Sequence, residues 1–280
     1  MMSLEEIKKE LDKKGIIYPT SIFNNTEQEI REIYEASKEA QASQQEVIID
    51  LSNENLSPSY MASASRSKKI YLYQNQVVYY KYELTKNEIF AEVFAYLLGS
   101  QLGLNMAKVE LARYKETEVI ISYDIGQTKE VEEYELYSIK KYEQITGFIE
   151  MCLFDYVIMN EDRHIGNWTV LLDREEVAPL YDHNHTFGGE QELAPTHENF
   201  RNITSAFCVE SDYDYFHDKI LEYLYRKHKE KVEGFIKKIE GIEKIEHVLL
   251  EQIDAKKVAS MNKLLQKRIA DMKRSVKNYE

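Results

Sequence analysis

The sequence predicts an α+β fold in two parts, a small β-rich part followed by a larger, mainly helical part. Short apolar runs that are typical of strands surround one amphipathic helix at 87–102 and end near residue 123. After Asp124-Ile125-Gly126, apolar residues recur at helical spacing, most regularly in the tail 213–276. The exception is one further predicted hairpin at 168–181. Strands and helices that are segregated along the chain are typical of the α+β class.

The N-terminus and the β-rich part can be assigned element by element. Two polar amphipathic helices are predicted at 3–14 and 26–45, separated by the break at Tyr18-Pro19. Two hairpins are predicted next, each with a polar turn between its strands: 70–73 with 77–82, and 109–114 with 119–123. The helix between the hairpins should end at Gly103, because glycine commonly terminates helices.

Composition restricts the class of protein. The chain has 280 residues, of which 43% are hydrophobic, and this is enough for a packed core. Its net charge of −13 argues against direct nucleic-acid binding, which needs clustered Lys and Arg. The N-terminus is too charged for a signal peptide, and the apolar run 89–104 is too short to span a bilayer. We therefore expect a cytoplasmic protein without membrane contact, and secretion into a host as an effector is left open.

The most informative stretch is Asn160-Glu161-Asp162-Arg163-His164-Ile165-Gly166-Asn167, followed after a short hairpin by Leu180-Tyr181-Asp182. The runs 168–172 and 177–181 flank a polar turn, so a hairpin would bring Asn167 and Asp182 together at one end. Their oxygens could share one Mg²⁺. A carboxylate near the attacking hydroxyl, here Asp162, completes the set that a phosphotransferase needs.

A cationic residue for nucleotide phosphates is predicted at Lys81, at the end of the second strand. Val77, Tyr79 and Lys81 share one face of that strand because side chains alternate. Lys81 could reach the α- and β-phosphates of ATP if Glu92 or Glu88 on the next helix held it in place. The alternative is that the Lys81 ammonium simply extends into water, as lysines at strand ends commonly do.

These residues carry a resemblance to a known family. The segment from Asp162 to Asn167 resembles the catalytic loop of the phosphoinositide-kinase-like superfamily. Together with Asn160 and Pro179-Leu180-Tyr181-Asp182, it resembles more specifically the bacterial HipA-like Ser/Thr kinases. The helix that ends in Leu102-Gly103-Leu104-Asn105 is similar to the helix of the small lobe in that family. The resemblance runs from about residue 60 to about residue 190.

The resemblance implies a two-lobed protein-kinase-like fold, with a helical extension at 1–45, an N-lobe at 46–125 and a C-lobe at 126–280. It implies an ATP- and Mg²⁺-dependent enzyme that transfers the γ-phosphoryl group to a Ser or Thr of a protein substrate. Asp162 would orient or deprotonate the acceptor hydroxyl, and Asn167 and Asp182 would bind Mg²⁺. Other residues would serve the cofactor site: Lys81 and Glu92 at the phosphates, the backbone of Ser122, Tyr123 and Asp124 at the adenine, and His164 as support of the catalytic loop.

A phosphate-binding loop is expected before the first strand, at 63–69. It contains no glycine, so small Ala and Ser residues would have to allow the close approach of the backbone. HipA-like kinases use a Ser-rich loop of this kind and can autophosphorylate it, which implies Ser63, Ser65 or Ser67 as a modification site. An ordinary polar loop is the alternative.

Two departures from family patterns affect the choice of kinase family and the expected protein partner. His183-Asn184 stands after Asp182 where phosphoinositide kinases have Phe-Gly, and this favours the HipA-like side. HipA toxins carry an additional N-terminal subdomain that contacts a DNA-binding antitoxin, and the first 45 or so residues are too short for it. A regulatory protein partner is therefore left open.

Rival interpretations use the same residues. The histidines at 164, 183, 185 and 197 could form a zinc site, but no Cys cluster matches them. Cys152 and Cys208 have no nucleophile context, and we expect buried thiols rather than a disulfide. A pseudokinase-like binding module would use the same fold without turnover, yet all matched polar positions are present, and this favours catalysis. A small-molecule kinase stays open, because aminoglycoside-kinase-like enzymes have a similar catalytic layout.

Overall fold

The computed structural model describes residues 2–13, 27–28, 30–31, 34–35, 68–73, 76–81, 84–114, 117–126, 128–129, 138–187, 203–209 and 215–280. The chain divides into two compact units. The first contains Met1–Leu84 and Ala107–Lys129, and the second contains Thr85–Met106 and Glu130–Glu280. Antiparallel strands dominate the described part of the first unit, and helices dominate the second, which confirms the predicted mixture of α and β elements.

The N-terminal helix α1 (Leu4–Lys13) confirms the prediction at 3–14. Ser3 and Glu6 form a capping box: Glu6 N donates to Ser3 Oγ at 3.3 Å, and Ser3 N donates to Glu6 Oε2 at 2.8 Å. Ile7 and Leu11, one turn apart, are buried. Of the predicted helix at 26–45, the described positions between 27 and 35 are helical, and the rest lies outside the described residues.

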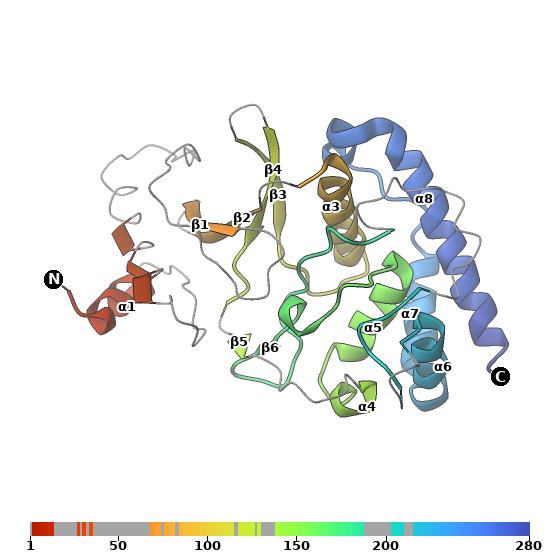
Figure 1. Ribbon diagram of the computed structural model, residues 1–280. Coiled ribbons are helices and arrows are strands. Elements are labelled where there is room, and N and C mark those ends of the chain that lie inside the picture. Colours follow the sequence, from red (N-terminus) through yellow and green to blue (C-terminus); the bar gives the residue numbers. More distant parts are fainter. Residues whose placement is uncertain are drawn as a thin grey trace. The chain divides into compact units, whose positions relative to one another are not determined.

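Four antiparallel strands form the sheet of the first unit (Figure 1): β1 (Lys68–Tyr73), β2 (Gln76–Lys81), β3 (Val109–Tyr114) and β4 (Thr117–Tyr123). Their order is β1-β2-β4-β3, so β4 is an inner strand between β2 and β3. Ser122 lies opposite Tyr79 on one side and opposite Val109 on the other. Both predicted hairpins are confirmed. A short strand, β5 (Thr128–Lys129), follows the turn at 124–126.

Helix α3 (Lys86–Gln101) begins and ends with sequence signals that fix its length. Thr85 and Glu88 form a capping box at its start. At its end, Gly103 adopts a φ of 74° and Leu104 N donates to Gly99 O at 2.9 Å, which confirms the predicted stop. The chain then runs beside the segment that leads to Asp182, because Leu180 N donates to Asn105 O at 2.8 Å.

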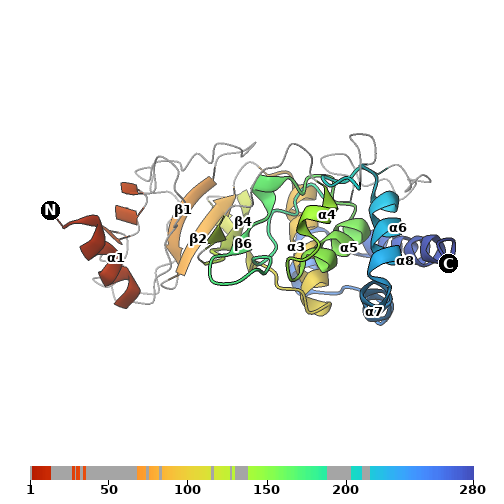
Figure 2. The same ribbon diagram turned by 90° about the horizontal axis from the view of Figure 1, so that it is seen from below.

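The second unit is built around helix α5 (Phe148–Ile158), whose side chains are almost all buried. It packs against α6 (His217–Lys227), α7 (Lys229–Glu240) and α8 (Val248–Lys277), and α3 packs against α8 (Figures 1 and 2). The short helix α4 (Ile139–Tyr142) contributes to an aromatic cluster of Tyr142, Phe148, Trp168 and Phe207. One member of this cluster, Trp168, directly follows the candidate catalytic loop in the chain.

The predicted hairpin at 168–181 is present but less regular than expected. Only Val170–Leu171 forms a strand, β6, and Val170 pairs with Val177 in an isolated bridge. Leu171 N donates to Glu176 O at 2.9 Å, which closes the turn. The polar turn residues, Asp173 to Glu175, are exposed.

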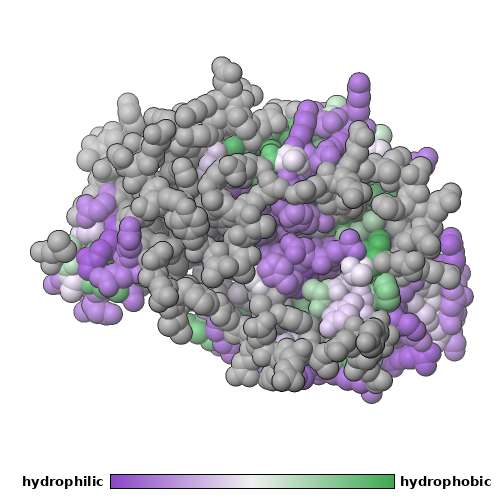
Figure 3. Space-filling model, viewed as in Figure 1, coloured by the Kyte–Doolittle hydropathy of each residue, from purple (hydrophilic) through white to green (hydrophobic). Residues whose placement is uncertain are grey.

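Figure 3 shows a predominantly hydrophilic surface over the C-terminal end of α8, at the right of the view. Both cysteines are buried free thiols, and burial raises the pKa of the Cys152 thiol. Among the described residues, no helix has the length and apolar character that a membrane span requires.

Candidate active site

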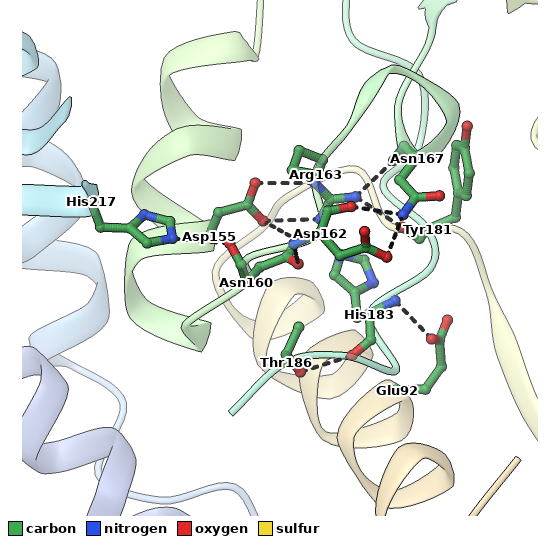
Figure 4. Close-up of polar contacts among 10 residues, drawn as sticks. All are labelled: Glu92, Asp155, Asn160, Asp162, Arg163, Asn167, Tyr181, His183, Thr186 and His217. Carbon is green, nitrogen blue, oxygen red and sulfur yellow. Dashed lines mark hydrogen bonds and ion pairs between the residues drawn. The ribbon is translucent and has the colours of Figure 1, made fainter. Parts of the chain in front are cut away.

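The candidate catalytic loop begins where α5 ends. Met159 takes the left-handed conformation with a φ of 57°, and Asn160 N donates to Asp155 O at 2.9 Å. The chain therefore leaves α5 abruptly and runs through Asp162 to the 3₁₀ turn η1 (Ile165–Asn167). Figure 4 shows the polar contacts that hold this loop.

A buried ion pair anchors the loop to α5. The Arg163 guanidinium donates from Nε to Asp155 Oδ2 and from Nη2 to Asp155 Oδ1, both at 3.0 Å, and both side chains are at most 3% exposed. Burial alone would lower the pKa of Arg163, but the adjacent Asp155 carboxylate outweighs it and raises the pKa. The guanidinium is therefore charged, and the planar fork fixes its orientation.

The same guanidinium holds both ends of the motif (Figure 4). Arg163 Nη1 donates to the carbonyl oxygen of Asn167 at 2.8 Å and to that of Tyr181 at 2.9 Å. Tyr181 is followed by Asp182, so one side chain connects α5, the loop and the segment that leads to the candidate metal ligand. The carbonyl groups of Asn167 and Tyr181 thus meet at one nitrogen, and the proximity of the Asn167 and Asp182 side chains stays a prediction.

Asp162 and Asn167 contact each other directly. Asn167 Nδ2 donates to Asp162 O at 2.7 Å and to Asp162 Oδ2 at 3.1 Å. Asp162 N donates to Asn160 Oδ1 at 3.0 Å, which fixes the backbone before the carboxylate. The two loop residues named by the sequence for catalysis therefore form one hydrogen-bonded unit (Figure 4).

His164 lies beside Asp162. Its Nδ1 accepts from Gly166 N at 3.0 Å, so the neutral ring carries its proton on Nε2. That nitrogen lies 3.6 Å from Asp162 Oδ1, and both side chains are 41% exposed. Its contact with Gly166 N agrees with the expected role as a support of the loop.

Asp182 has a backbone conformation that is uncommon for a residue with a side chain, with a φ of 62°. The next residue is held from α3, because His183 N donates to Glu92 Oε2 at 2.7 Å. Thr186 Oγ1 donates to His183 O at 2.8 Å, and Phe187 N donates to Ile158 O at 2.8 Å. The segment after Asp182 is therefore held by α3 and by α5, and by one hydrogen bond of its own, within the second unit.

Glu92 thus has a contact that sequence reasoning did not anticipate. It was expected to hold Lys81, and one of its oxygens accepts from the backbone after Asp182. Glu88, the other expected partner, accepts from Thr85 N at 2.6 Å in the cap of α3. Lys81 is the buried last residue of β2 in the first unit, and its pairing with a carboxylate stays a prediction.

The residues expected at the adenine lie at the end of β4 and just after it. Tyr123 OH donates to Glu110 Oε2 at 2.7 Å, and burial, with Glu110 nearby, raises the pKa of Tyr123 to about 12. The Asp124 carboxylate accepts from Tyr79 OH and Gly126 N, while burial raises its pKa. Both side chains are used inside the first unit, so an adenine contact through the backbone of Ser122, Tyr123 and Asp124 stays a prediction.

Several candidate positions are not described. Ser63, Ser65 and Ser67 lie outside the described residues, as does His197. Within the part of the chain that the structure describes, no three His, Cys, Asp or Glu side chains are grouped as a metal site.

Sequence reasoning missed the residues that position the loop. Asn160 and Arg163 were named only as parts of the motif, and Asp155 was not named, although it is the one acidic residue in the C-terminal half of an otherwise apolar helix. A charged residue in a helix that is buried on all sides needs a partner. That signal was available in the sequence, but it did not identify Arg163 as the partner.

No family model and no curated protein sequence matches the chain. Among solved structures, a Helicobacter pylori proinflammatory kinase, CtkA, is similar with a TM-score of 0.54 and 17% identity, over 80% of this chain and 95% of that chain. The HipA, HipB and operator DNA complex of a Shewanella oneidensis MR-1 toxin–antitoxin system also matches. Its TM-score is 0.50 at 10% identity, over 96% of this chain and 70% of that one. The chain therefore has the fold of the HipA-like kinases.

Proposed function

We propose that this protein is an ATP- and Mg²⁺-dependent kinase that transfers the γ-phosphoryl group to a Ser or Thr of a protein. The observation that carries this proposal is the connection made by Arg163. It joins the loop of Asp162 and Asn167 to the carbonyl that precedes Asp182. These are the groups that a kinase uses at the acceptor hydroxyl and at the metal.

The donor set suits magnesium. Both hydrogen bonds of Asn167 Nδ2 go to Asp162, so the amide is oriented and its Oδ1 is the remaining ligand atom. Asp182 would supply a carboxylate oxygen, and Mg²⁺ prefers oxygen ligands. When bound, Mg²⁺ would neutralise charge on the ATP phosphates. Asn167 and Asp182 are accordingly the proposed metal ligands.

Asp162 is the proposed group at the acceptor hydroxyl. The acceptor oxygen forms a bond to the γ-phosphorus while the bond from that phosphorus to the β–γ bridging oxygen breaks, and ADP leaves. The hydroxyl proton passes to the Asp162 carboxylate. The hydrogen bond from Asn167 Nδ2 to Asp162 Oδ2 fixes one carboxylate oxygen, which leaves Oδ1, on the side of His164, for the acceptor.

The remaining parts of the proposal follow the expectations from the sequence. The chain would comprise a helical extension at 1–45, a small lobe at 46–125 and a large lobe at 126–280. ATP would be held by Lys81 and Glu92, by the backbone at Ser122, Tyr123 and Asp124, and by the loop with Ser63, Ser65 and Ser67, one of which would be autophosphorylated. We expect action in the cytoplasm on a protein substrate, with a regulatory protein partner left open and no direct nucleic-acid contact.

The test is phosphoryl transfer from γ-labelled ATP as a function of Mg²⁺ concentration. We compare the wild type with Asn167→Ala and Asp182→Ala, and with Asp173→Ala as a control in the exposed turn of the hairpin. Mg²⁺-dependent label in the wild type and the control, lost in the other two variants, is expected. Absence of label, with ATP still raising the melting temperature, would instead indicate a binding module. If the wild type is labelled, mass mapping of its peptides would test whether the phosphate lies on Ser63, Ser65 or Ser67.

A further inference from the structure

The two residues before Asp162 are both held by a segment far downstream in the chain. His217 Nε2, at the start of α6, lies 2.9 Å from the carbonyl oxygen of Asn160. Glu161 Oε1 accepts from Thr204 N at 3.0 Å and from Thr204 Oγ1 at 2.8 Å. The proposed function assigns no role to Thr204 or His217.

These two anchors belong to one small piece of structure. Thr204 pairs with Phe216 in an antiparallel bridge, His217 N donates to Ile203 O at 3.0 Å, and Ser205 N donates to Tyr215 O at 2.6 Å. Thr204 and His217 therefore keep a fixed spacing.

The chemistry of His217 identifies the direction of its hydrogen bond. A carbonyl oxygen can only accept, so Nε2 carries the proton and donates to Asn160 O. His217 is 2% exposed, and its Nδ1 is buried without a hydrogen-bond partner. Burial, together with the nearby Arg268 charge, lowers the pKa of His217 to about 4, so the ring stays neutral at pH 7.

The buried His217 Nδ1, which accepts no hydrogen bond, destabilises the fold, and an apolar residue at position 217 would avoid this cost. What an apolar residue could not supply is the donor to Asn160 O. The presence of His217 is therefore explained better by the hydrogen bond that it donates to Asn160 O in the loop than by its packing.

Asn160 is the connection between His217 and Asp162 (Figure 4). Its Nδ2 donates to Asp155 Oδ1 at 2.9 Å, and its Oδ1 accepts from Asp162 N. With the carbonyl bound by His217, the side chain and both backbone polar groups of Asn160 are all fixed. The direction in which the chain enters Asp162 is set by that peptide group.

We propose that His217 is a positioning residue for Asp162, acting through the Asn160 carbonyl, and that Thr204 assists it by holding Glu161. This inference rests on the proposed role of Asp162 in phosphoryl transfer. It adds that Thr204 and His217, which come after Asp182 in the chain, determine the geometry of the catalytic carboxylate.

The test compares His217→Leu, which removes the donor, with His217→Gln, whose amide NH₂ can replace Nε2–H. His228→Leu is the matched control, because His228 Nε2 also contacts one acceptor, Glu143 Oε2 at 3.0 Å, away from the loop. Misplacement of a catalytic group by about 1 Å can lower the rate roughly 100-fold. We expect His217→Leu to lower kcat about 10- to 100-fold with KM for ATP within about twofold, and His217→Gln to restore most of kcat. Thr204→Val, at an exposed position, should lower kcat by a smaller factor.

Hydrogen exchange of the peptide 159–168 is the second readout, and it does not require activity. His217→Leu should accelerate exchange of this peptide by about tenfold or more, while His217→Gln and His228→Leu should not. Unchanged exchange and an unchanged kcat in His217→Leu would overturn the positioning role. A wild type without phosphoryl transfer would instead refute the proposed function. Hydrogen exchange can therefore refute the positioning role separately from the phosphoryl-transfer assay, which tests the proposed function.

Discussion

Removal of one partner from the ion pair of Asp155 and Arg163 should destabilise the second unit more than removal of both. The guanidinium is 1% exposed and makes four hydrogen bonds, two to Asp155 and one each to the carbonyls of Asn167 and Tyr181. Asp155→Leu leaves a buried charge without a counter-ion, which costs about 3–5 kcal/mol. Arg163→Met leaves the Asp155 carboxylate in the same situation and should cost a similar amount.

The double variant Asp155→Leu/Arg163→Met removes both charges. Apolar replacement of a complete buried pair is far less destabilising than breakage of the pair. We expect the double variant to be more stable than the sum of the single effects predicts, by at least about 2 kcal/mol. The two carbonyls and Asn160 still lose their partner, so full recovery is not expected.

Urea unfolding measures this directly. Trp168 is the only tryptophan, is buried, and follows Asn167 in the chain, so its fluorescence reports on the region affected. Additive single effects, or a loss below about 1 kcal/mol in Asp155→Leu, would show that the pair does not hold the loop.

Two further predictions concern stability. The pKa of His217 is about 4 in the folded protein against about 6.5 unfolded, so its contribution is present above pH 6.5 and is lost as the pH falls toward 4. Between pH 7 and pH 5 the wild type should therefore lose about 2 kcal/mol more than His217→Gln in chemical unfolding, and parallel pH profiles would refute this assignment. A Cβ at Gly99 would overlap Met106 Sδ, so Gly99→Ala should lower the free energy of unfolding by about 1–2 kcal/mol despite the better helix propensity of Ala. The double variant Gly99→Ala/Met106→Ala should relieve that contact, and no improvement over Gly99→Ala would contradict the steric explanation.

Local patterns allowed much of the fold to be predicted from the sequence. Alternation and turn residues located the hairpins of β1–β2 and β3–β4, and Gly103 located the end of α3, because these signals act between residues close in the chain. The hairpin after Asn167 was also predicted, since its two runs flank an obvious polar turn. Its regular part is limited to β6, and Val170 pairs with Val177 only in an isolated bridge.

The support of the candidate site could not be predicted in the same way. The contact of His217 with Asn160 joins residues 57 apart, and that of Glu92 with His183 joins residues 91 apart. No periodicity relates such positions, so only the folded chain shows them. The contacts of Arg163 with Asp155 and Asn167 join residues that are closer in the chain, because Arg163 lies within the motif. The sequence indicated that Asp162 and Asn167 matter without showing that Arg163 holds them.

The most direct test of the central proposal is the initial rate of γ-phosphoryl transfer from labelled ATP by the wild type and by Asp162→Asn. Asn at 162 keeps the size of the side chain and its capacity to accept from Asn167 Nδ2, but it cannot take the proton of the acceptor. We expect transfer by the wild type and a loss of about 100-fold or more in the variant. Equal rates for the two proteins would contradict the proposal.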